Sequence, residues 1–560
     1  MSKIASYILM VMIFTLSCTN NHNHSFIEFK HSFSQWNLIY SPTSSFITVN
    51  DPLLYQKKFI GEEYINDIKR FLIELNQINP KRLDKENNLE YQSIKIFLEY
   101  NIFVNETLNF DEWNALYLLN NYYHHLSYIG KLVQYKYTAR APSPTLDFLI
   151  SEIKFFNDQI FFLMKNLKYK HNAEPELIVL SSLIEKMINY SDHIVNYALE
   201  NQLVTTLHRD IKSLRRTMYQ LRDWHENQYH KLKPFQNKIS DINYKKYFNL
   251  NSDFRIEFID ILNNTKTALA KHKKILFELS LPLYLKNNDE PVWTDFSDTV
   301  NVINTVLDTL ENVGYKCSDK DAAIRIIDSS IYELFNDNLY KNKDIIFIYH
   351  NQEVENDFNY YNTKGINEIY VNTSKSSDNL FQNYYFTLMN LLPGDLFIYN
   401  RLKENDGFNS IYLNRDYFYG FKLFLINYYL KNSTRKSDDS ILCGLKNSEY
   451  LTVMKLFYLK DRMIDCIGAI ATINYYLEKK DISDSIQSHD QLNLINDKKN
   501  NLLKEEIFGY KMDSIIKFIS INKFQNLLQN GNRADELKLL NILYENPNMN
   551  LIPIEKLFNK

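Results

Sequence analysis

Hydrophobic residues recur every three or four positions along most of the chain, which is the spacing of one face of an α-helix. The segment that begins at residue 143 shows this best: Ser143 suits an N-cap, Pro144 suits the first helical position, and apolar residues keep the period as far as Leu167. Ser318 and Asp321 form a capping box before another such segment. The same period predicts helices over 57–77, 87–105, 112–135, 175–200, 203–232, 252–281, 296–313, 413–430, 448–479 and 503–529.

Two short segments have a different pattern. Residues 344–350 and 366–373 are runs of β-branched and aromatic residues, which predict two strands able to pair in a small sheet. The polar segment 480–501 predicts a surface loop. The chain holds only 11 Gly and 12 Pro in 560 residues, about a third of their usual share. Because no Pro-, Ser- or Gly-rich linker divides it, we expect one large all-α body over 31–560 with a small β element near 344–373.

The first residues have the features of an export signal. Lys3 precedes an apolar run of 13 residues, Ile4 to Leu16, which is shorter than the roughly 20 residues needed to span a bilayer. The following "TLSC" resembles a bacterial lipobox, although Thr15 stands where Leu is preferred. We therefore expect a signal peptide over 1–17 and a lipid, palmitate included, on Cys18.

The expected consequence is an exported lipoprotein. Residues 18–30 would form a polar tether that contains His22 and His24, both expected to be solvated. Acyl chains on Cys18 would hold the folded body at a bacterial membrane. The absence of Asp after Cys18 favours the outer membrane or the cell surface. An ordinary secreted protein or an N-terminal anchor is the alternative.

Charge and cysteine content narrow the function further. The net charge is −3, and the short run "KHKK" at 271–274 is no basic stripe, so nucleic acid is not an expected partner. Beyond Cys18 the chain has Cys317, Cys443 and Cys466, an odd number with no metal-binding spacing. We expect small buried side chains, with one disulfide as the alternative.

Three segments in a fixed order carry a family resemblance: "EIYVNT" (368–373), "FTLMNLLPGDLF" (386–397) and "YFYGFKLFLINYYL" (417–430). The order resembles a bacterial family of large helical proteins related to the gluzincin zinc peptidases, with the motifs H-E-x-x-P-G-H-H and E-G-W-A-L-Y-A-E. The segment 98–126 is similar to that family's aromatic helix pair, with Trp113-Asn114 in its middle. The resemblance covers about 90–430 and implies a gluzincin-like, neurolysin-like helical body.

The resemblance keeps the family's Pro-Gly pair, here Pro393-Gly394, and the Gly of its second motif, here Gly420. The residues expected to bind zinc or to catalyse hydrolysis are replaced. Those positions are occupied by Met389, Asn390, Asp395, Leu396 and Tyr419.

These replacements remove the chemistry that a hydrolytic zinc site needs. Such a site uses about three imidazole or carboxylate ligands and a Glu that accepts the proton of the attacking water. The Met389 thioether is a poor zinc ligand, the Asn390 carboxamide accepts no proton, and the Tyr419 phenol has an ordinary pKa near ~10. We expect no cofactor, no metal and no catalytic residue. The expected function is that of a pseudoenzyme, a non-catalytic zinc-peptidase-like lipoprotein that binds peptides or protein partners at the membrane surface.

Two alternatives remain open. One is an active hydrolase or peptidase that uses other residues, and the other is a surface adhesin-type interaction protein whose former cleft has collapsed around Met389. For a binding function, the resemblance implies that an edge strand beside the cleft takes up a peptide by strand addition. Tyr370 and Asn372 are then the candidate cleft-edge contacts, with an ordinary core strand as the alternative.

Other histidines match no motif. His225 and His230 flank Glu226 but stand five positions apart, about 140° around a helix, whereas a zinc pair needs spacing of four. We expect a surface helix there. His124 and His125 are expected to be packing or surface residues, and His350, at the end of the first strand, is a weak functional candidate.

Overall fold

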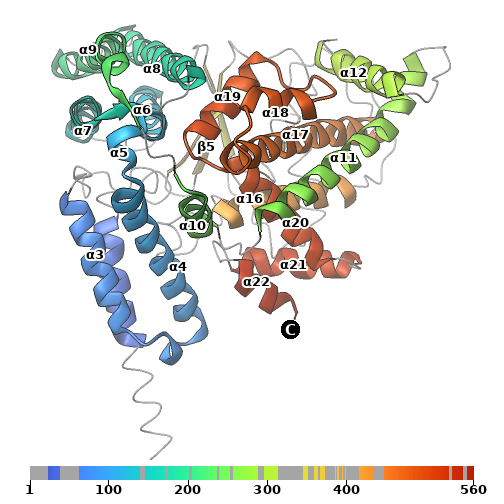
Figure 1. Cartoon of the computed structure of the whole chain (residues 1–560), viewed down its shortest axis with the longest axis horizontal. Helices are drawn as coiled ribbons and strands as arrows, with labels where there is room; N and C mark the ends of the chain where they lie inside the picture. Colours follow the sequence, from blue (N-terminus) through green and yellow to red (C-terminus); the bar gives the residue numbers. More distant parts are fainter. Residues whose placement is uncertain are drawn as a thin grey trace, which may run out of the picture.

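The computed structural model shows an all-α protein with a small β element, as predicted (Figure 1). Cys18, Cys317 and Cys443 lie outside the described residues, as does the helix expected after Ser318. The structure describes residues 23–37, 62–138, 146–170, 174–200, 205–235, 239–252, 257–287, 296–312, 345–350, 358–363, 366–372, 385, 388–389, 394, 398, 415–432, 447–528, 532–546 and 551–559.

Three helices form an N-terminal module: residues 23–37, α3 (Glu62–Gln77) and α4 (Lys85–Ile102), with the short 3₁₀ helix η2 (Pro80–Arg82) between the last two. Phe33 is fully buried among the rings of Phe71 and Phe97, and a cluster of buried residues spans all three helices. The polar tether expected over 18–30 is therefore too long, because Phe26 and Phe29 give residues 23–30 an apolar face to bury.

The helix α4 continues directly into the π-helix η3 (Phe103–Leu108), which ends at Asn109 in a left-handed conformation (φ 49°). The short α5 (Phe110–Trp113) follows. Residues of α4 up to Leu98 belong to the core of the N-terminal module, whereas Phe103 and Val104 belong to the core of the rest of the protein.

A four-helix layer comes next along the chain. Its helices are α6 (Ala115–Thr138), α7 (Leu146–Asn166), α8 (Glu174–Glu200) and α9 (Thr205–Asn227). They form a ring in which α6 and α9 each contact both α7 and α8. Two short parallel strands, β1 (Tyr169–Lys170) and β2 (Lys233–Pro234), and the 3₁₀ helix η4 (Tyr229–Lys231) link its ends.

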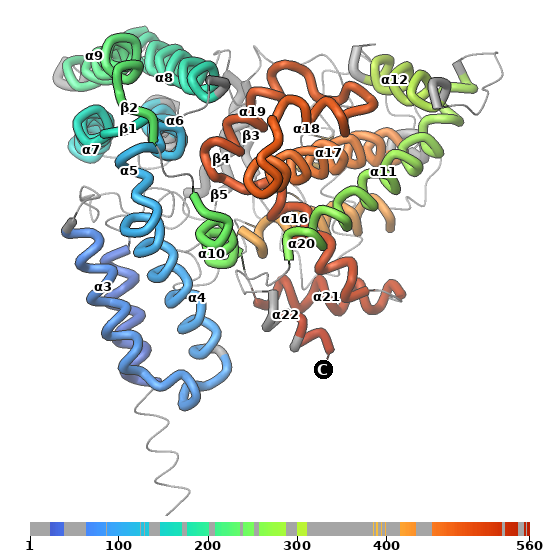
Figure 2. Tube along the Cα trace, viewed as in Figure 1, coloured from blue at the N-terminus to red at the C-terminus, as the bar shows by residue number. Residues whose placement is uncertain are grey.

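The C-terminal body is built on the long helices α11 (Phe258–Asn287) and α17 (Asn447–Tyr476), which lie side by side (Figures 1 and 2). α20 (Asp513–Leu527) packs against both α17 and α16 (Arg415–Asn432). The other helices of the body are α10 (Asp241–Asn251), α12 (Phe296–Asn312), α18 (Ile482–His489), α19 (Asp497–Phe508), α21 (Arg533–Glu545) and α22 (Leu551–Phe558).

Two predictions in this body were wrong. The expected loop over 480–501 contains α18, because Ile482 and Ile486 are buried and the Asp481 side chain caps the helix by accepting from the Ser483 and Asp484 amides. The single helix expected over 503–529 is broken at Tyr510 and Met512, which adopt left-handed conformations between α19 and α20.

The predicted strands exist and pair in a three-stranded sheet. Its order is β3 (Ile345–His350), β5 (Ile366–Asn372), β4 (Phe358–Thr363), with β5 parallel to β3 and antiparallel to β4. β5 is thus the central strand. The prediction that it is a cleft edge was wrong, because its hydrogen-bonding groups already face two neighbours.

Among the described residues, no helix combines the length and the apolarity that crossing a bilayer requires.

Candidate functional site

The Pro-Gly break follows a buried helical turn. Leu388 is fully buried, and Met389 packs against the same core at its partly exposed margin. A Cβ atom on Gly394 would lie 2.0 Å from the Met389 carbonyl oxygen and 2.7 Å from that of Leu388. Only glycine therefore allows the chain to pass this close to the turn that precedes it. Asn390, Asp395 and Leu396 lie outside the described residues.

Tyr419, which the sequence resemblance aligns with a ligand Glu, forms a hydrogen bond with a carboxylate. Its hydroxyl donates to Asp513 Oδ1 over 3.1 Å. Arg415, one turn earlier on α16, forms an ion pair with the same carboxylate and also donates to the Lys511 carbonyl oxygen. Residues four apart lie on one helix face, so α16 presents Arg415 and Tyr419 together to the start of α20.

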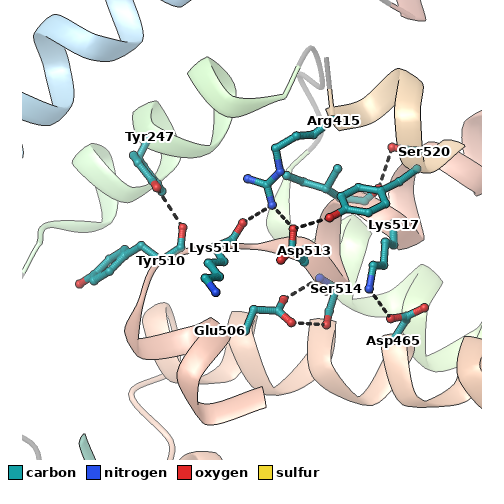
Figure 3. A network of polar contacts seen from close by, with 12 residues as sticks. Tyr247, Arg415, Asp465, Glu506, Tyr510, Lys511, Asp513, Ser514, Lys517 and Ser520 are labelled. Atoms are coloured by element: carbon teal, nitrogen blue, oxygen red, sulfur yellow. Dashed lines mark hydrogen bonds and ion pairs between the residues drawn. The ribbon is translucent and has the colours of Figure 1, made fainter. Parts of the chain in front are cut away.

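A second carboxylate stands beside this pair (Figure 3). Glu506, near the end of α19, accepts from the Ser514 amide over 2.6 Å and from the Ser514 hydroxyl over 3.0 Å. It thereby satisfies one of the amides that the first turn of α20 leaves without a helical partner.

The two carboxyl groups have opposite pKa shifts. Burial alone would raise the pKa of Asp513, but the nearby Arg415, Lys517 and Lys511 charges outweigh it and hold that pKa below its usual range. Burial, with the negative charge of Asp513, raises the pKa of Glu506. Burial, with the same Asp513 charge, also raises the pKa of Tyr419. The phenol therefore stays protonated and is a donor to Asp513.

The interactions extend onto α17. Lys517 Nζ lies 3.5 Å from Asp465 Oδ1 and 5.4 Å from the centre of the Tyr419 ring. Asp465 also pairs with Arg462 on its own helix. We call the following residues the charge cluster: Arg415, Tyr419, Asp465, Glu506, Asp513, Ser514 and Lys517.

The backbone next to the charge cluster is strained. Tyr510 and Met512 have φ values of 57° and 56°, on either side of Lys511. Non-glycine residues adopt this conformation at a cost of about 1–3 kcal/mol each and do so mainly where the surroundings enforce it. Here the Tyr510 carbonyl accepts from the Tyr247 hydroxyl over 2.9 Å, and the Lys511 carbonyl accepts from Arg415. No motif in the sequence predicted this turn.

The tightness of the α16–α20 contact explains Gly420. A Cβ at this position would lie 2.6 Å from the Phe524 ring and 3.0 Å from Ser520 Cβ. The Gly that the resemblance retains therefore serves helix packing in this structure.

The Trp-Asn pair of the resemblance holds a junction together. Trp113 is buried, donates from Nε1 to the Leu108 carbonyl over 2.8 Å and stacks on Phe235. Asn114 is also buried, and its Oδ1 accepts from the Tyr117 amide at the start of α6 over 2.9 Å. The pair fixes the turn between α5 and α6.

The expected surface position of the residues 225–230 was partly wrong. His225 is buried and its ring lies 5.0 Å from that of His230, because α9 ends at Asn227 and the chain turns back. Burial, with a contribution from the His230 charge, lowers the pKa of His225 to about 4. Glu226 instead lies 4.0 Å from Arg222 on the surface of α9.

The other single candidates divide between core and surface. His125 is buried, with Nδ1 2.8 Å from Gln159 Oε1 and Nε2 3.0 Å from Glu152 Oε2. This is the packing role expected for it. His24 is on the surface beside Glu28. The side chains of His124 and His350 and of the strand residues Tyr370 and Asn372 are not among those described, although the backbone pairs Tyr370 with Ile348 and Asn359, and Asn372 with His350.

Cys466 is buried as expected, and burial raises the pKa of its thiol to about 12. Among the described side chains, no three His, Cys, Asp or Glu residues are grouped as metal ligands would be.

Comparison with known proteins places the fold. No protein-family model and no curated protein matches the chain. Its fold is similar to that of a "putative lipoprotein of unknown function" from Shewanella oneidensis, at 14% identity and a TM-score of 0.64, with 96% of this chain and 100% of the other covered. It is also similar to that of a "putative lipoprotein" from Colwellia psychrerythraea, at 10% identity and a TM-score of 0.64, with 96% and 98% covered. The chain therefore shares one helical architecture with these two structures over almost its whole length.

Proposed function

We propose that this protein is a non-catalytic, zinc-peptidase-like protein, anchored by a lipid on Cys18, that binds a peptide or protein partner at the membrane surface. The observation that carries the proposal is the hydrogen bond from Tyr419 to Asp513, whose charge Arg415 already balances. A carboxylate ligand at position 419 would compete for that Arg415, and a phenol with a raised pKa has no free anion to offer zinc.

The donor set at the aligned positions does not fit zinc. Met389 supplies a thioether that packs against the apolar core, and Tyr419 supplies a proton donor. Zinc prefers imidazole, thiolate and carboxylate ligands. No step of hydrolysis is therefore assigned to these residues.

Two observations support lipid anchoring. The sequence "TLSC" ends an apolar run of signal-peptide length, and both similar structures bear the word lipoprotein in their names. The expected location is the outer membrane or the cell surface. Mass spectrometry of the N-terminal peptide from detergent-extracted protein tests this: acylated Cys18 is expected, and an intact N-terminus starting at Met1 would contradict it.

Partner binding by strand addition must use another strand than β5. Of the described strands, β3 and β4 are the outer ones, and each has one hydrogen-bonding edge that faces away from β5. We assign the peptide-binding role to β4, whose antiparallel pairing with β5 is compatible with a further antiparallel strand.

The decisive experiment combines metal analysis with peptide turnover. Protein purified without chelators is expected to contain far less than one zinc per chain and to leave a mixed peptide library intact. The matched variant Tyr419→Glu is expected to behave in the same way, because the other aligned ligands are also missing. About one zinc per chain with steady cleavage by the parent protein would overturn the proposal and favour an active peptidase.

A second function is favoured by one observation. Leu388 is fully buried and Met389 packs beside it, which is what a filled cleft requires. In that case the protein is a surface interaction protein of the adhesin type, and its exterior binds the partner. In the register of β4 with β5, the amides of Tyr360 and Asn362 face away from β5. Peptide-array binding that is lost when Tyr360 or Asn362 is replaced by Pro supports the strand-edge function. If these changes do not alter partner binding, the result supports the function of an adhesin-type surface interaction protein.

A further inference from the structure

The end of the N-terminal module nearest to Cys18 carries a group of exposed basic residues. Helix 23–37 begins where α3 ends and α4 starts, because the Asn23 side chain accepts from the Asp84 amide over 3.1 Å. The turn between α3 and α4 exposes the residues that we call the basic tip: Lys81, Arg82 and Lys85.

We propose that the basic tip docks on the anionic headgroups of the membrane that holds the lipid anchor. The proposal rests on the proposed lipid at Cys18. Only four residues separate Cys18 from Asn23, so the fully extended chain between them reaches at most about 17 Å. The Asn23–Asp84 contact then keeps the α3–α4 turn within the same distance of the bilayer.

The charge at this end has the sign that an anionic surface needs. Residues 79–86 contain three basic and two acidic side chains, the latter being Asp84 and Glu86, whereas the whole chain has a net charge of −3. Asp84 caps the first turn of α4: it accepts from the Asn87 amide and the Asn87 side-chain nitrogen, each over 2.8 Å, and stays exposed, so the net charge of residues 79–86 is +1.

Two exposed isoleucines stand one turn above the basic tip. Ile27 follows Asn23 by four positions and is 53% exposed, and Ile73 precedes Gln77 by four positions and is 63% exposed. Four helical residues rise about 6 Å, which is within the depth of about 5–10 Å that interfacial apolar side chains reach in a bilayer. The end of the module thus combines charge for the headgroups with apolar side chains at the depth of the upper acyl chains.

The test uses the chain from residue 18 with Cys18→Ser, so that no anchor contributes to binding. Its partition onto phosphatidylcholine vesicles is compared with that onto vesicles that also contain phosphatidylglycerol. We expect binding only to the anionic vesicles, weakened by salt. Each basic residue near such a surface contributes about fivefold, so K81Q/R82Q/K85Q should bind roughly a hundredfold more weakly.

A matched control removes three exposed lysines elsewhere: K271Q/K274Q/K498Q, on or next to α11 and α19. It is expected to bind anionic vesicles like the parent. I27S/I73S should reduce partition without changing its salt dependence. Both tip variants should keep the parent's thermal unfolding midpoint, because the replaced side chains are exposed.

Equal partition of the parent onto both kinds of vesicle, or equal losses in the tip and control variants, would overturn the proposal. Because Cys18 is absent from this assay, a failure here is distinct from a failure of lipid anchoring. A second measurement labels the acylated protein on vesicles with a lysine-modifying reagent that does not cross membranes. Protection of Lys81 and Lys85 from this reagent would support docking. Full labelling of Lys81 and Lys85 on vesicles would contradict it.

Discussion

At the scale of single residues, the charge of Asp513 decides how α16, α19 and α20 fit together. Arg415 and the Tyr419 hydroxyl both contact Asp513. Lys517, one turn further along α20, pairs with Asp465, and both ion pairs are mostly shielded from water. Removing one partner of such a pair costs more than the pair contributes, because the remaining charge loses its compensation.

Replacing Arg415 by Met should therefore destabilise the protein by about 2–4 kcal/mol. Urea unfolding followed by circular dichroism measures this. The control is Arg70→Met, which removes an Arg that is 54% exposed beside Asp67 and Glu74 and should change stability by less than about 0.5 kcal/mol. Equal effects of the two changes would mean that the charge cluster is not a structural unit.

Two histidines, His225, which is buried, and His272, which is partly buried, should make the protein sensitive to mild acid. Burial, with the charges of neighbouring basic groups, lowers the pKa of His225 and of His272 to about 4. The unfolded protein, in which these histidines have a pKa of about 6.5, binds protons more readily than the folded protein. The stability that the neutral histidines contribute is therefore complete above pH ~6.5 and is lost as the pH falls toward about 4.

Protonation of each histidine should therefore lower the free energy of unfolding by up to about 3 kcal/mol over that range. His225→Gln, measured by urea unfolding at several pH values, is expected to flatten the curve between pH ~6.5 and ~4. A variant curve parallel to that of the parent would show that folding does not lower the pKa of His225.

At the scale of elements, the closeness of α16 and α20 depends on Gly420. Gly420→Ala places a methyl group against Phe524 and Ser520, which should cost about 1–3 kcal/mol, less the gain of up to about 1 kcal/mol in helix propensity. Thermal unfolding measures the balance. In a protein that already carries Phe524→Leu, the change Gly420→Ala should cost less stability than it does in the parent, because the smaller side chain leaves more room for the added methyl group. A stabilised Gly420→Ala would show that α20 moves away at little cost.

The helical period and the two aromatic strand segments were sufficient to predict the fold class and most helices from the sequence. α18 was missed because its polar residues hide two buried isoleucines, Ile482 and Ile486. β4 was missed because "FNYYNT" is half polar, and without it β5 was wrongly placed at an edge. The pairing of β4 with β5 is local, since only residues 364–365 separate the two strands, but it could not be predicted without recognising β4 as a strand.

The candidate site was predictable only in part. The position of Tyr419 was named from the sequence, but its partners Arg415 and Asp513 were not. Asp513 is 94 residues away from Tyr419 along the chain and follows a left-handed turn with no glycine at its strained positions. No local sequence pattern predicts a contact between residues so far apart in the chain.

At the scale of the whole molecule, the buried residues that the structure describes form two separate clusters, one in the N-terminal module and one in the rest. Loss of packing in one should therefore be felt mainly there. Phe33→Ala, at a fully buried ring that contacts Phe71 and Phe97, should destabilise the module by about 3–5 kcal/mol.

Hydrogen exchange measured by mass spectrometry tests the division. Phe33→Ala is expected to speed exchange in 23–37, α3 and α4 and to leave α16–α20 at the parent's rates. Phe524→Ala, the matched change in the larger cluster, should have the reverse pattern. Uniform acceleration by either variant would mean that the two clusters unfold as one.

The π-helical turn at Phe103–Leu108 lies where the chain passes from the module to the rest of the protein. A π turn holds one residue more than an α turn, yet each completes a full rotation about the axis. Deleting a single residue here should therefore restore regular winding and leave the module in nearly the same orientation. A one-residue deletion that would rotate everything beyond it by about 100° elsewhere in a helix should be tolerated at this position.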